Sequence, residues 1–452
     1  MTGILPLAVA LTLGLPSQAP LLDLHSQSAT LDNGLRVITV QSNSPGVVAY
    51  YTMVEVGVRN EHLAAEEGLS HLLEHLMFRG TENLSEEEYR QTIQALGADN
   101  NAQTEQDHTL YTVVAPKGAL PEIIELESER MMYAKTTEAQ FRAEARAVLG
   151  EYEKSMASPL IPLWESLSAL AFDVHPYAHT ALGPRSAIES MGDAHEATQT
   201  FMKQHYTPDN TVVVVVGDLE HETVLSHIEK RYGGWSGSTA SSEPTREPPQ
   251  TSPRHTTLSW PTPMPPVLAL GYRVPGVSID SAQPVESLYP QAALHLIQTL
   301  LFAESAPFYR SWHRETGRVL DLQYWEAKHH LDAHLFLASF TLHPKIGSKD
   351  LLAGLQQTLD GIANGEIDVA QLERARTHLR YRMALELETP ADIAKALATW
   401  SARGGNAKSL EHYAQAIASV PLSFIASMAR TYLRVEHRNV VELSSHHAEA
   451  KL

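Results

Sequence analysis

Val47-Val-Ala-Tyr-Tyr-Thr-Met-Val-Glu-Val-Gly-Val58 is a β-rich run, and it precedes the apolar helical segment His71-Leu-Leu-Glu-His-Leu-Met-Phe78. The same order returns in the second half of the chain, where Pro266-Val-Leu-Ala-Leu-Gly-Tyr-Arg-Val-Pro-Gly-Val277 precedes His295-Leu-Ile-Gln-Thr-Leu-Leu-Phe302. The two octets agree at His, Leu, Leu and Phe. A repeated order of strand and helix predicts two homologous domains that arose by duplication.

Composition separates these halves at residues 234–265, where Gly, Ser and Pro are frequent and hydrophobic periodicity is lacking. We therefore predict a first domain over residues 20–233, a linker over 234–265 and a homologous second domain over 266–452. Strand-like runs lie at 36–40, 47–56, 109–114 and 212–216, and helical patterns at 68–78, 85–96, 120–134, 138–156 and 194–205. Because the two kinds of segment do not alternate regularly, the pattern favours the α+β class with largely antiparallel sheets.

Charge and cysteine usage narrow the function. The formal net charge of −19 argues against nucleic acid or an anionic membrane surface as a partner, since both bind clustered Lys and Arg. The chain has 0 Cys, which excludes disulfides, thiol nucleophiles and Cys-ligated metal. A metal ion would therefore be held by His and carboxylate side chains.

The N-terminal residues 1–19 have the pattern of an export signal. An apolar run at 4–15 is too short to span a bilayer and is followed by Pro16-Ser-Gln-Ala19, which suits cleavage after Ala19. This predicts a periplasmic or secreted protein. No Lys or Arg precedes Arg36, so an ordinary apolar arm of a cytoplasmic protein is the alternative. No other segment approaches the ~18 apolar residues of a membrane helix.

His71 and His75 are four residues apart, so on a helix both imidazoles lie on one face and can bind one zinc ion. Glu74 shares that face and can act as general base towards a metal-bound water. This His-x-x-Glu-His order is the inverzincin pattern. A solvated helix face is the alternative, but the apolar neighbours predict a mostly buried helix, in which an unpaired carboxylate is costly.

A catalytic zinc ion commonly has three protein ligands, and this helix supplies only two. Glu151 is the predicted third ligand, and Glu153 is the alternative. Glu144 lies seven residues before Glu151 and hence on the same helical face. We expect Glu144 to hydrogen-bond one of the metal-binding groups.

With these motifs the chain resembles the pitrilysin, insulin-degrading-enzyme and mitochondrial-processing-peptidase family of inverzincins, over nearly its whole length. The resemblance rests on Asn33-Gly34-Leu35-Arg36-Val37, Gly57, His71-x-x-Glu74-His75, Phe78-x-Gly80-Thr81, Asn101-Ala102-x-Thr104-x-x-Asp107-x-Thr109-x-Tyr111, Glu144, Glu151, His175-Pro-Tyr177 and Tyr206-x-Pro-x-Asn210.

The resemblance implies a zinc endopeptidase whose two α+β domains form half of a clamshell that closes around extended peptides. One zinc ion per chain would be bound by His71, His75 and Glu151, with Glu74 as the base. Asn101 and Ala102 match positions that hold the substrate backbone. A structural turn before the strand at Thr109 is the alternative for these two residues.

The family also uses an Arg and a Tyr, seven residues apart, to stabilise the oxyanion. Arg314 matches this Arg, but Asp321 occupies the Tyr position and Tyr324 has a different strand register. Gln298 and Thr299 replace the Glu and His of the zinc motif in the second domain.

We therefore expect the zinc-bearing subunit of a heterodimer whose homologous partner supplies the Arg/Tyr pair. A homodimer, with Arg314 and Tyr324 near the oxyanion, is the alternative assembly. The alternative function is a non-catalytic assembly or processing-complex subunit with a structural zinc site.

Overall fold

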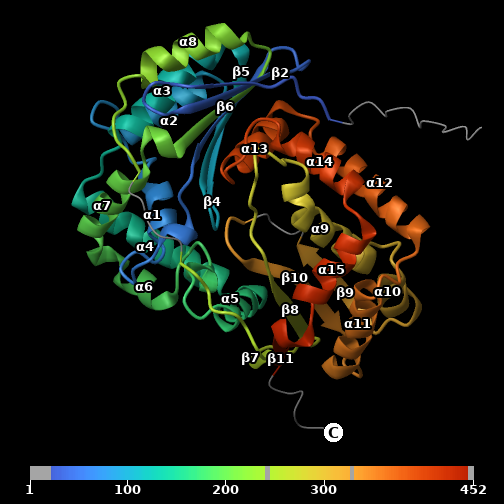
Figure 1. Cartoon of the computed structure of the whole chain (residues 1–452). Coiled ribbons are helices and arrows are strands. Elements are labelled where there is room, and N and C mark those ends of the chain that lie inside the picture. The colour runs from blue at the N-terminus through green and yellow to red at the C-terminus, as the bar shows by residue number, and fades with distance from the viewer. Residues whose placement is uncertain (1–21, 240–244, 326–329, 446–452) are drawn as a thin grey trace, which may run out of the picture.

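The computed structural model describes residues 22–239, 245–325 and 330–445, which form two lobes, one from each half of the chain (Figure 1). The predicted export signal at 1–19 lies outside the described residues. Each lobe contains one mainly antiparallel sheet with helices packed against it. This confirms two homologous α+β domains.

The first sheet has the strand order β1-β2-β6-β3-β5-β4, and only the β2–β6 pair is parallel. Its strands are β1 (Gln27–Thr30), β2 (Arg36–Gln41), β3 (Val47–Val54), β4 (Asp99–Thr104), β5 (Thr109–Pro116) and β6 (Thr211–Gly217). The helices of this half are α1 (Leu69–Leu76), α2 (Glu86–Ala95), α3 (Leu120–Tyr133), α4 (Glu138–Ser155), α5 (Leu160–Ala171), α6 (Arg185–Ser190), α7 (His195–His205) and α8 (His221–Tyr232). The strand and helix segments predicted for this half are confirmed, and β4 forms one edge of the sheet.

The second sheet repeats this topology in the order β7-β11-β8-β10-β9, again with its one parallel pair at β7–β11. Its strands are β7 (Arg254–Trp260), β8 (Val267–Val274), β9 (Val319–Trp325), β10 (His334–Leu342) and β11 (Arg438–Ser445). Its helices are α9 (Tyr289–Phe302), α10 (Pro307–Tyr309), α11 (Ser348–Ala363), α12 (Val369–Leu385), α13 (Pro390–Ser401), α14 (Ser409–Ser419) and α15 (Leu422–Tyr432). The matching strand orders support a duplication.

Strand β7 lies inside the stretch 234–265 that composition predicts as a linker. Its side chains alternate between exposed and half-buried positions, so no apolar run reveals it. The strand forms because its backbone pairs with β11 over residues 254–260. Backbone pairing at a sheet edge leaves little trace in the hydrophobic pattern.

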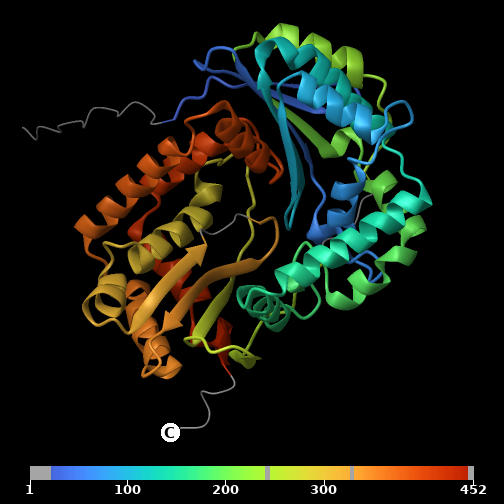
Figure 2. The ribbon, with the colours of Figure 1, turned by 180° about the vertical axis from the view of Figure 1, so that it is seen from behind.

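Each sheet is covered on one face by a helix from the other half of the chain. Val212, Val214 and Val216 of β6 pack against Leu397 and its neighbours on α13, whereas Val213 and Val215 face the helices of their own half. Both views show α13 beside the first sheet (Figure 1, Figure 2). In return, α5 packs its Leu163 and Leu167 on Val267, Ala269, Val441 and Leu443 of the second sheet. The continuous valine run in β6 is therefore explained by burial on both faces.

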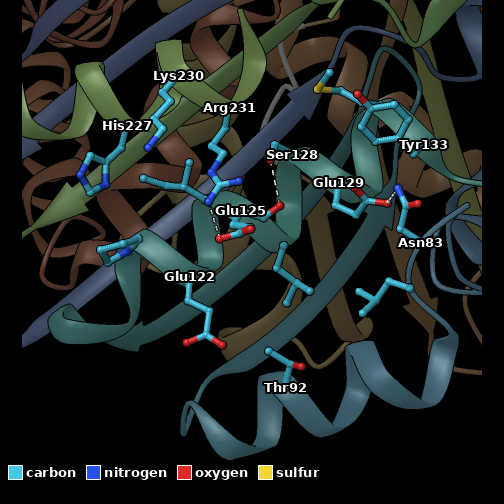
Figure 3. Close-up of a pocket in the computed structure, with 15 residues that line it drawn as sticks. Asn83, Thr92, Glu122, Glu125, Ser128, Glu129, Tyr133, His227, Lys230 and Arg231 are labelled. Carbon is cyan, nitrogen blue, oxygen red and sulfur yellow. Dashed lines mark hydrogen bonds and ion pairs between the residues drawn. The ribbon is translucent and has the colours of Figure 1, made fainter. Parts of the chain in front are cut away.

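An open hollow of about 840 Å³ lies over α2, α3 and α8 (Figure 3), and no residue of α1 lines it. Acidic and basic side chains share its lining, and Arg231 Nη2 donates to Glu125 Oε2 at 2.5 Å across it. These charges compensate one another, so the hollow has no single chemical character.

In the part of the chain that the structure describes, no helix is both long and apolar enough to span a bilayer.

Buried and half-buried polar groups join the two domains. We call this group the interdomain seam, and it consists of Arg59, Asp107, His108, His175, Tyr177, His330, Asp332 and His334. Burial lowers the pKa of His108 to about 4 and the pKa of His334 to about 3. Both histidines are therefore neutral in the folded protein at neutral pH.

The seam predicts loss of stability in acid. A His whose pKa is depressed in the folded state stabilises the fold above its unfolded pKa of about 6.5, and this stabilisation is lost as the pH falls towards the folded pKa. We expect the free energy of unfolding to fall by up to about 1.4 kcal/mol per pH unit for each such His below pH about 6.5. His334→Asn should reduce this slope in denaturant titrations between neutral pH and pH about 4.5. His25→Asn, at a side chain that is 82% exposed, is the matched control, and equal slopes in all three proteins would contradict the prediction.

Candidate metal centre

Helix α1 carries both histidines, and its start is fixed by a residue outside the helix. The carboxylate of Glu61 accepts hydrogen bonds from the backbone N–H groups of Gly68 at 2.8 Å and Ser70 at 2.9 Å. Gly68 has φ 82°, a left-handed conformation that suits glycine. Glu61 is only 3% exposed, and burial raises its pKa to about 8. A buried acceptor at the N-terminus of α1 thus fixes where the helix begins.

Helix α4 brings two carboxylates to the same place. It begins with a capping box between Thr137 and Gln140 and packs against α1. Glu144 and Glu151 lie two turns apart on the face of α4 that meets α1. Of the two predicted candidates for a third ligand, Glu151 joins the histidines and Glu153 is not part of that group.

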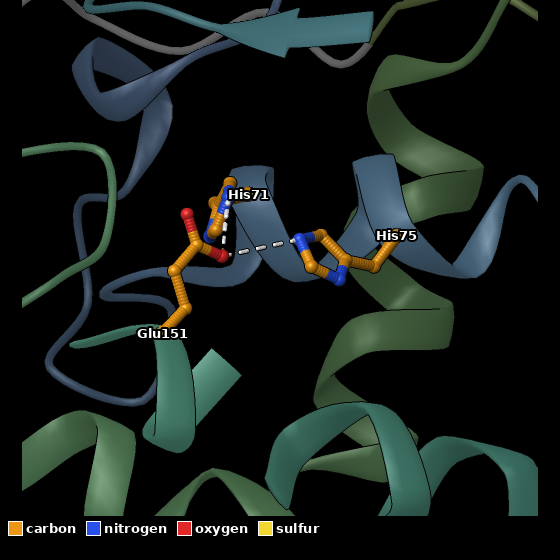
Figure 4. Close-up of side chains that lie close together, drawn as sticks. All are labelled: His71, His75 and Glu151. Atoms are coloured by element: carbon orange, nitrogen blue, oxygen red, sulfur yellow. Dashed lines mark ion pairs between the residues drawn. The ribbon is translucent and has the colours of Figure 1, made fainter. Parts of the chain in front are cut away.

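Three ligand atoms converge between α1 and α4 (Figure 4). Glu151 Oε2 lies 3.8 Å from His71 Nε2 and 3.6 Å from His75 Nε2. Both distances exceed those of a good hydrogen bond, about 2.7–3.2 Å. They are close to the ~3.3 Å that separates two ligands of a tetrahedral zinc ion with bonds of about 2.0–2.1 Å. The residues present therefore fit a zinc ion.

The protonation state of His71 suits metal binding. Burial, with a smaller effect of His75, lowers the pKa of His71 to about 4, so His71 is neutral near pH 7. The side chain of Glu151 is 46% exposed, which leaves the group open to solvent on that side. Neutral imidazole is the form in which a histidine binds a metal ion.

Glu144 contacts the Nδ1 side of His75, opposite the Nε2 atom that faces Glu151. Its Oε2 lies 3.4 Å from His75 Nδ1, and its Oε1 lies 2.8 Å from Arg79 Nε. The hydrogen bond to Glu144 raises the pKa of His75. Burial opposes ionisation of Glu144, but His75 and Arg79 together outweigh it and lower its pKa. The pair fixes the ring of His75 with Nε2 towards Glu151.

Glu74 lies on α1 between the two histidines and contacts the edge strand β4. Thr104 Oγ1 donates a hydrogen bond to Glu74 Oε2 at 2.7 Å. Burial raises the pKa of Glu74. A carboxylate with a raised pKa beside a metal-ligand set is suited to accept and return a proton.

Asn101 and Ala102 lie inside β4 and not in a turn. β4 pairs only with β5, so its other edge is free of strand partners among the described residues. Ala102 packs towards the core that contains α1, whereas the side chain of Asn101 is exposed. The edge of β4 can accept an extended chain by strand addition.

Two family models match the sequence: the insulinase family, peptidase family M16, over residues 36–185, and the peptidase M16 inactive domain over residues 195–379. The chain belongs to peptidase family M16. It is 26% identical to the zinc protease PqqE of Helicobacter pylori over 420 residues, which cover 90% of each chain.

Two further relatives bear on the fold of this M16 chain. The crystal structure of a protease from Helicobacter pylori matches it with a TM-score of 0.83 and 25% identity, covering 93% of this chain and 99% of that one. A probable mitochondrial-processing peptidase subunit beta of Schizosaccharomyces pombe is 30% identical over 210 residues, or 46% of this chain and 45% of that protein. The described part of the chain thus has the fold of a solved protease structure.

In the second domain of this M16 protein, different side chains occupy two of the three positions that match the His-x-x-Glu-His motif. His295 stands where the first domain has His71, and its Nδ1 lies 2.9 Å from the hydroxyl of Tyr413. Gln298 donates to the carbonyl of Trp325 at 2.8 Å, and Thr299 donates to the carbonyl of His295 at 2.9 Å. The polar groups of this helix serve internal hydrogen bonds.

The residues predicted near the oxyanion lie at the edge of the second sheet. Arg314 is in a π-helical segment, Arg310–Glu315, and pairs with Glu304. Asp321 is exposed on β9 and accepts a hydrogen bond from Gln323. Tyr324 packs against the ring of Phe302 in the core, on the opposite face of β9 from Asp321. The different register predicted for Tyr324 is confirmed.

Three residues that support the centre were not predicted in these roles: Glu61, Arg79 and Thr104. Arg79 and Thr104 lie next to or within motifs of the family pattern, Phe78-x-Gly80 and Asn101-Ala102-x-Thr104. Position within a motif was thus the available signal for both. Glu61 lies in a loop without periodicity, where one sequence gives no sign of its contact with α1.

Proposed function

We propose that this chain is a zinc-dependent endopeptidase with His71, His75 and Glu151 as metal ligands and Glu74 as general base. The observation that carries the proposal is one carboxylate oxygen of Glu151 that lies 3.6–3.8 Å from the Nε2 atoms of both histidines, too far for good hydrogen bonds. Among the described residues these three ligand atoms all lie within 4.8 Å of one another. Membership of a family of zinc peptidases supports the choice of metal.

The residues would divide the reaction between them. Zinc, when bound, supplies Lewis-acid catalysis by lowering the pKa of a coordinated water and polarising the peptide carbonyl. Glu74 takes the proton from the attacking water and delivers it to the leaving amine, and its raised pKa suits this exchange. Glu144 keeps His75 oriented, and Thr104 keeps Glu74 oriented.

The substrate would be an extended peptide or an unfolded segment. A free strand edge that carries Asn101 and Ala102 offers backbone hydrogen bonds to a chain without secondary structure. Within a closed chamber formed by two half-clamshells, folded proteins would be excluded. The predicted export signal at 1–19 would place this activity in the periplasm or outside the cell.

We further propose that the active enzyme contains a second, homologous chain. Asp321 replaces the oxyanion Tyr of the family pattern, and an ionised carboxylate cannot donate a hydrogen bond to an oxyanion. Arg314 is exposed and occupied by Glu304. A relative named as a subunit beta supports an assembly of more than one chain. A partner with an intact Arg/Tyr pair would complete the site, and a homodimer is the second candidate.

A non-catalytic subunit with a structural zinc site is the competing function. A structural zinc site usually has four protein ligands and needs no base. The three-residue group leaves one position open, and Glu74 stands beside it. These two features favour the peptidase.

Removing one ligand should abolish zinc binding. Purified protein should contain about one zinc ion per chain by atomic emission, and His71→Ala and His75→Ala should each lose it. Glu153→Gln is the matched control on α4, because that carboxylate lies outside the ligand group and should leave the zinc content unchanged. Full zinc occupancy in both His variants would rule out the site.

Removing the base should separate metal binding from turnover. Glu74→Gln should keep its zinc, since Glu74 is not a ligand, and lose at least ~10²-fold in kcat because it cannot accept a proton. The measurement is cleavage of a quenched fluorescent peptide with and without chelator. Wild-type turnover by Glu74→Gln would show that another group activates the water, and chelator-resistant cleavage would exclude the metal.

The missing oxyanion donor predicts low activity of the chain alone. Loss of one such donor typically costs ~10²–10³-fold in rate. Co-expression with a homologous chain that carries the Arg and Tyr should therefore raise kcat by a comparable factor. Mutation of the partner's Tyr to Phe should remove the gain. Full activity of this chain alone, unaffected by Arg314→Ala, would exclude both the heterodimer and the contribution of Arg314.

A further inference from the structure

We propose that residues 330–332 of the second domain act as a positioning element for Glu74, through Asp107 and the hairpin formed by β4 and β5. The inference rests on the proposed function, in which Glu74 is the general base. In this inference the second domain, which lacks the candidate metal ligands, helps to position the general base of the first domain.

Asp107 ties the turn of the hairpin to the second domain. It lies between β4 and β5 and is 4% exposed. Its Oδ2 accepts hydrogen bonds from His330 Nδ1 at 2.8 Å and from the backbone N–H of Leu331 at 3.3 Å, and its Oδ1 accepts one from the Tyr177 hydroxyl. Burial opposes ionisation, but His330 and Tyr177 outweigh it and hold the pKa of Asp107 below its usual range. The tie is therefore a buried, charge-assisted hydrogen bond.

Residues 330–332 are themselves anchored. The carbonyl of His330 accepts a hydrogen bond from Val277 N at 2.7 Å, just after β8. The carbonyl of Leu331 lies so close to Gly276 that a Cβ atom there would be 2.2 Å from it, so this approach requires glycine. Because its own backbone is held in place, this segment can restrain the residues that it contacts.

Asp332 adds a second link from this segment to the first domain. Its Oδ2 accepts hydrogen bonds from Arg59 Nε at 2.5 Å and from His175 Nε2 at 3.2 Å. His175 Nδ1 accepts from the backbone N–H of Tyr177 at 3.1 Å, so the hydrogen of the neutral ring is on Nε2, where it faces Asp332. The segment therefore meets the first domain at two carboxylates, Asp107 and Asp332.

The other side of the turn leads to the base. The carbonyl of Glu105 accepts a hydrogen bond from Val58 N, and the carbonyl of Gln106 accepts one from Arg59 N at 2.8 Å. Thr104, directly before this turn, donates to Glu74 Oε2 at 2.7 Å. Only residues 105 and 106 separate Thr104 from Asp107. A shift of the turn would therefore change the hydrogen bond on Glu74.

An edge strand needs such support. Within the described parts of the chain, β4 pairs with β5 alone, so the sheet restrains it from one side only. The seam holds the hairpin from its turn, next to the residue that contacts the base. Displacement of a catalytic group by about 1 Å can cost as much as ~10²-fold in rate, so restraint of the hairpin bears directly on kcat.

The test compares three single variants in the zinc-loaded enzyme, alone or with its homologous partner, whichever assembly is more active. His330→Ala removes the donor to Asp107. His330→Asn keeps a donor close to the position of Nδ1. Arg254→Gln is the matched control, because Arg254 also joins the two halves, with Asp173 at 2.9 and 2.6 Å, but its partners lie outside the hairpin.

We expect His330→Ala to lower kcat on a quenched fluorescent peptide by ~10- to 10²-fold, with zinc content unchanged and KM within about twofold. His330→Asn should restore most of kcat, and Arg254→Gln should keep it. In a double-mutant cycle with Thr104→Val, His330→Ala should add little further loss, since both act through one contact. An unchanged kcat in His330→Ala, equal losses in Arg254→Gln, or fully additive losses with Thr104→Val would each overturn the proposal.

Amide hydrogen exchange provides a readout that does not depend on activity. His330→Ala should speed exchange in residues 99–109 by at least ~10-fold, and Arg254→Gln should not. Unchanged exchange there would overturn the inference even in an active peptidase. If the zinc-loaded wild type cleaves no peptide, the proposed function fails, and the exchange pattern alone decides whether the second domain holds the hairpin.

Discussion

Both faces of each sheet are apolar, and the helices of each half cover only one of them. On the first sheet, one face carries Val212, Val214 and Val216 and the other carries Val213 and Val215, so both faces must be buried. Each half covers the second face of the other half's sheet: α13 packs on the first sheet, and α5 packs on the second. Burial of this area stabilises the fold by about 25 cal/mol per Å² of apolar surface. Without the other domain, one apolar face of each sheet would be exposed to water. We therefore expect the two halves to fold as one unit.

The candidate metal centre depends on the core at the other face of the first sheet, because α1 and α4 owe their relative position to that core. Leu72 and Leu73 on α1 and Phe141 and Val148 on α4 belong to one buried cluster. With this crossing fixed, the i, i+4 spacing on α1 and the i, i+7 spacing on α4 are enough to bring four side chains together. Local contacts then refine the centre, as Arg79 and Glu144 do for His75.

The sequence predicted the parts of this structure that follow from local pattern. Alternating and 3.6-residue periods identified the main strands and helices of the first half, and helical spacing placed Glu144 and Glu151 on one face. It could not predict which sheet α5 or α13 would cover, because an amphipathic pattern shows that a face is buried but not against what. Strand β7 was not predicted, because it forms by backbone pairing with β11 and has no apolar run in its sequence. The contacts of Glu61 and Asp107 could not be predicted either. They are tertiary contacts, and the type of a single residue does not reveal its partner in the fold.

In the second domain, the positions that match the candidate metal ligands contribute to packing and to internal hydrogen bonds. Leu372, Ala375, Leu379 and Met383 form the buried face of α12, whose counterpart α4 buries the carboxylate of Glu144. His295 pairs with the hydroxyl of Tyr413, Gln298 donates to the carbonyl of Trp325, and Thr299 donates to the carbonyl of His295, so this face of α9 belongs to the core. The second domain contacts the first through α13, which covers the first sheet, and through residues 330–332, which meet Asp107 and His175. In the arrangement that we propose, this second contact determines where the edge strand β4 and its hydrogen bond to Glu74 lie, because Asp107 and Thr104 belong to the same hairpin.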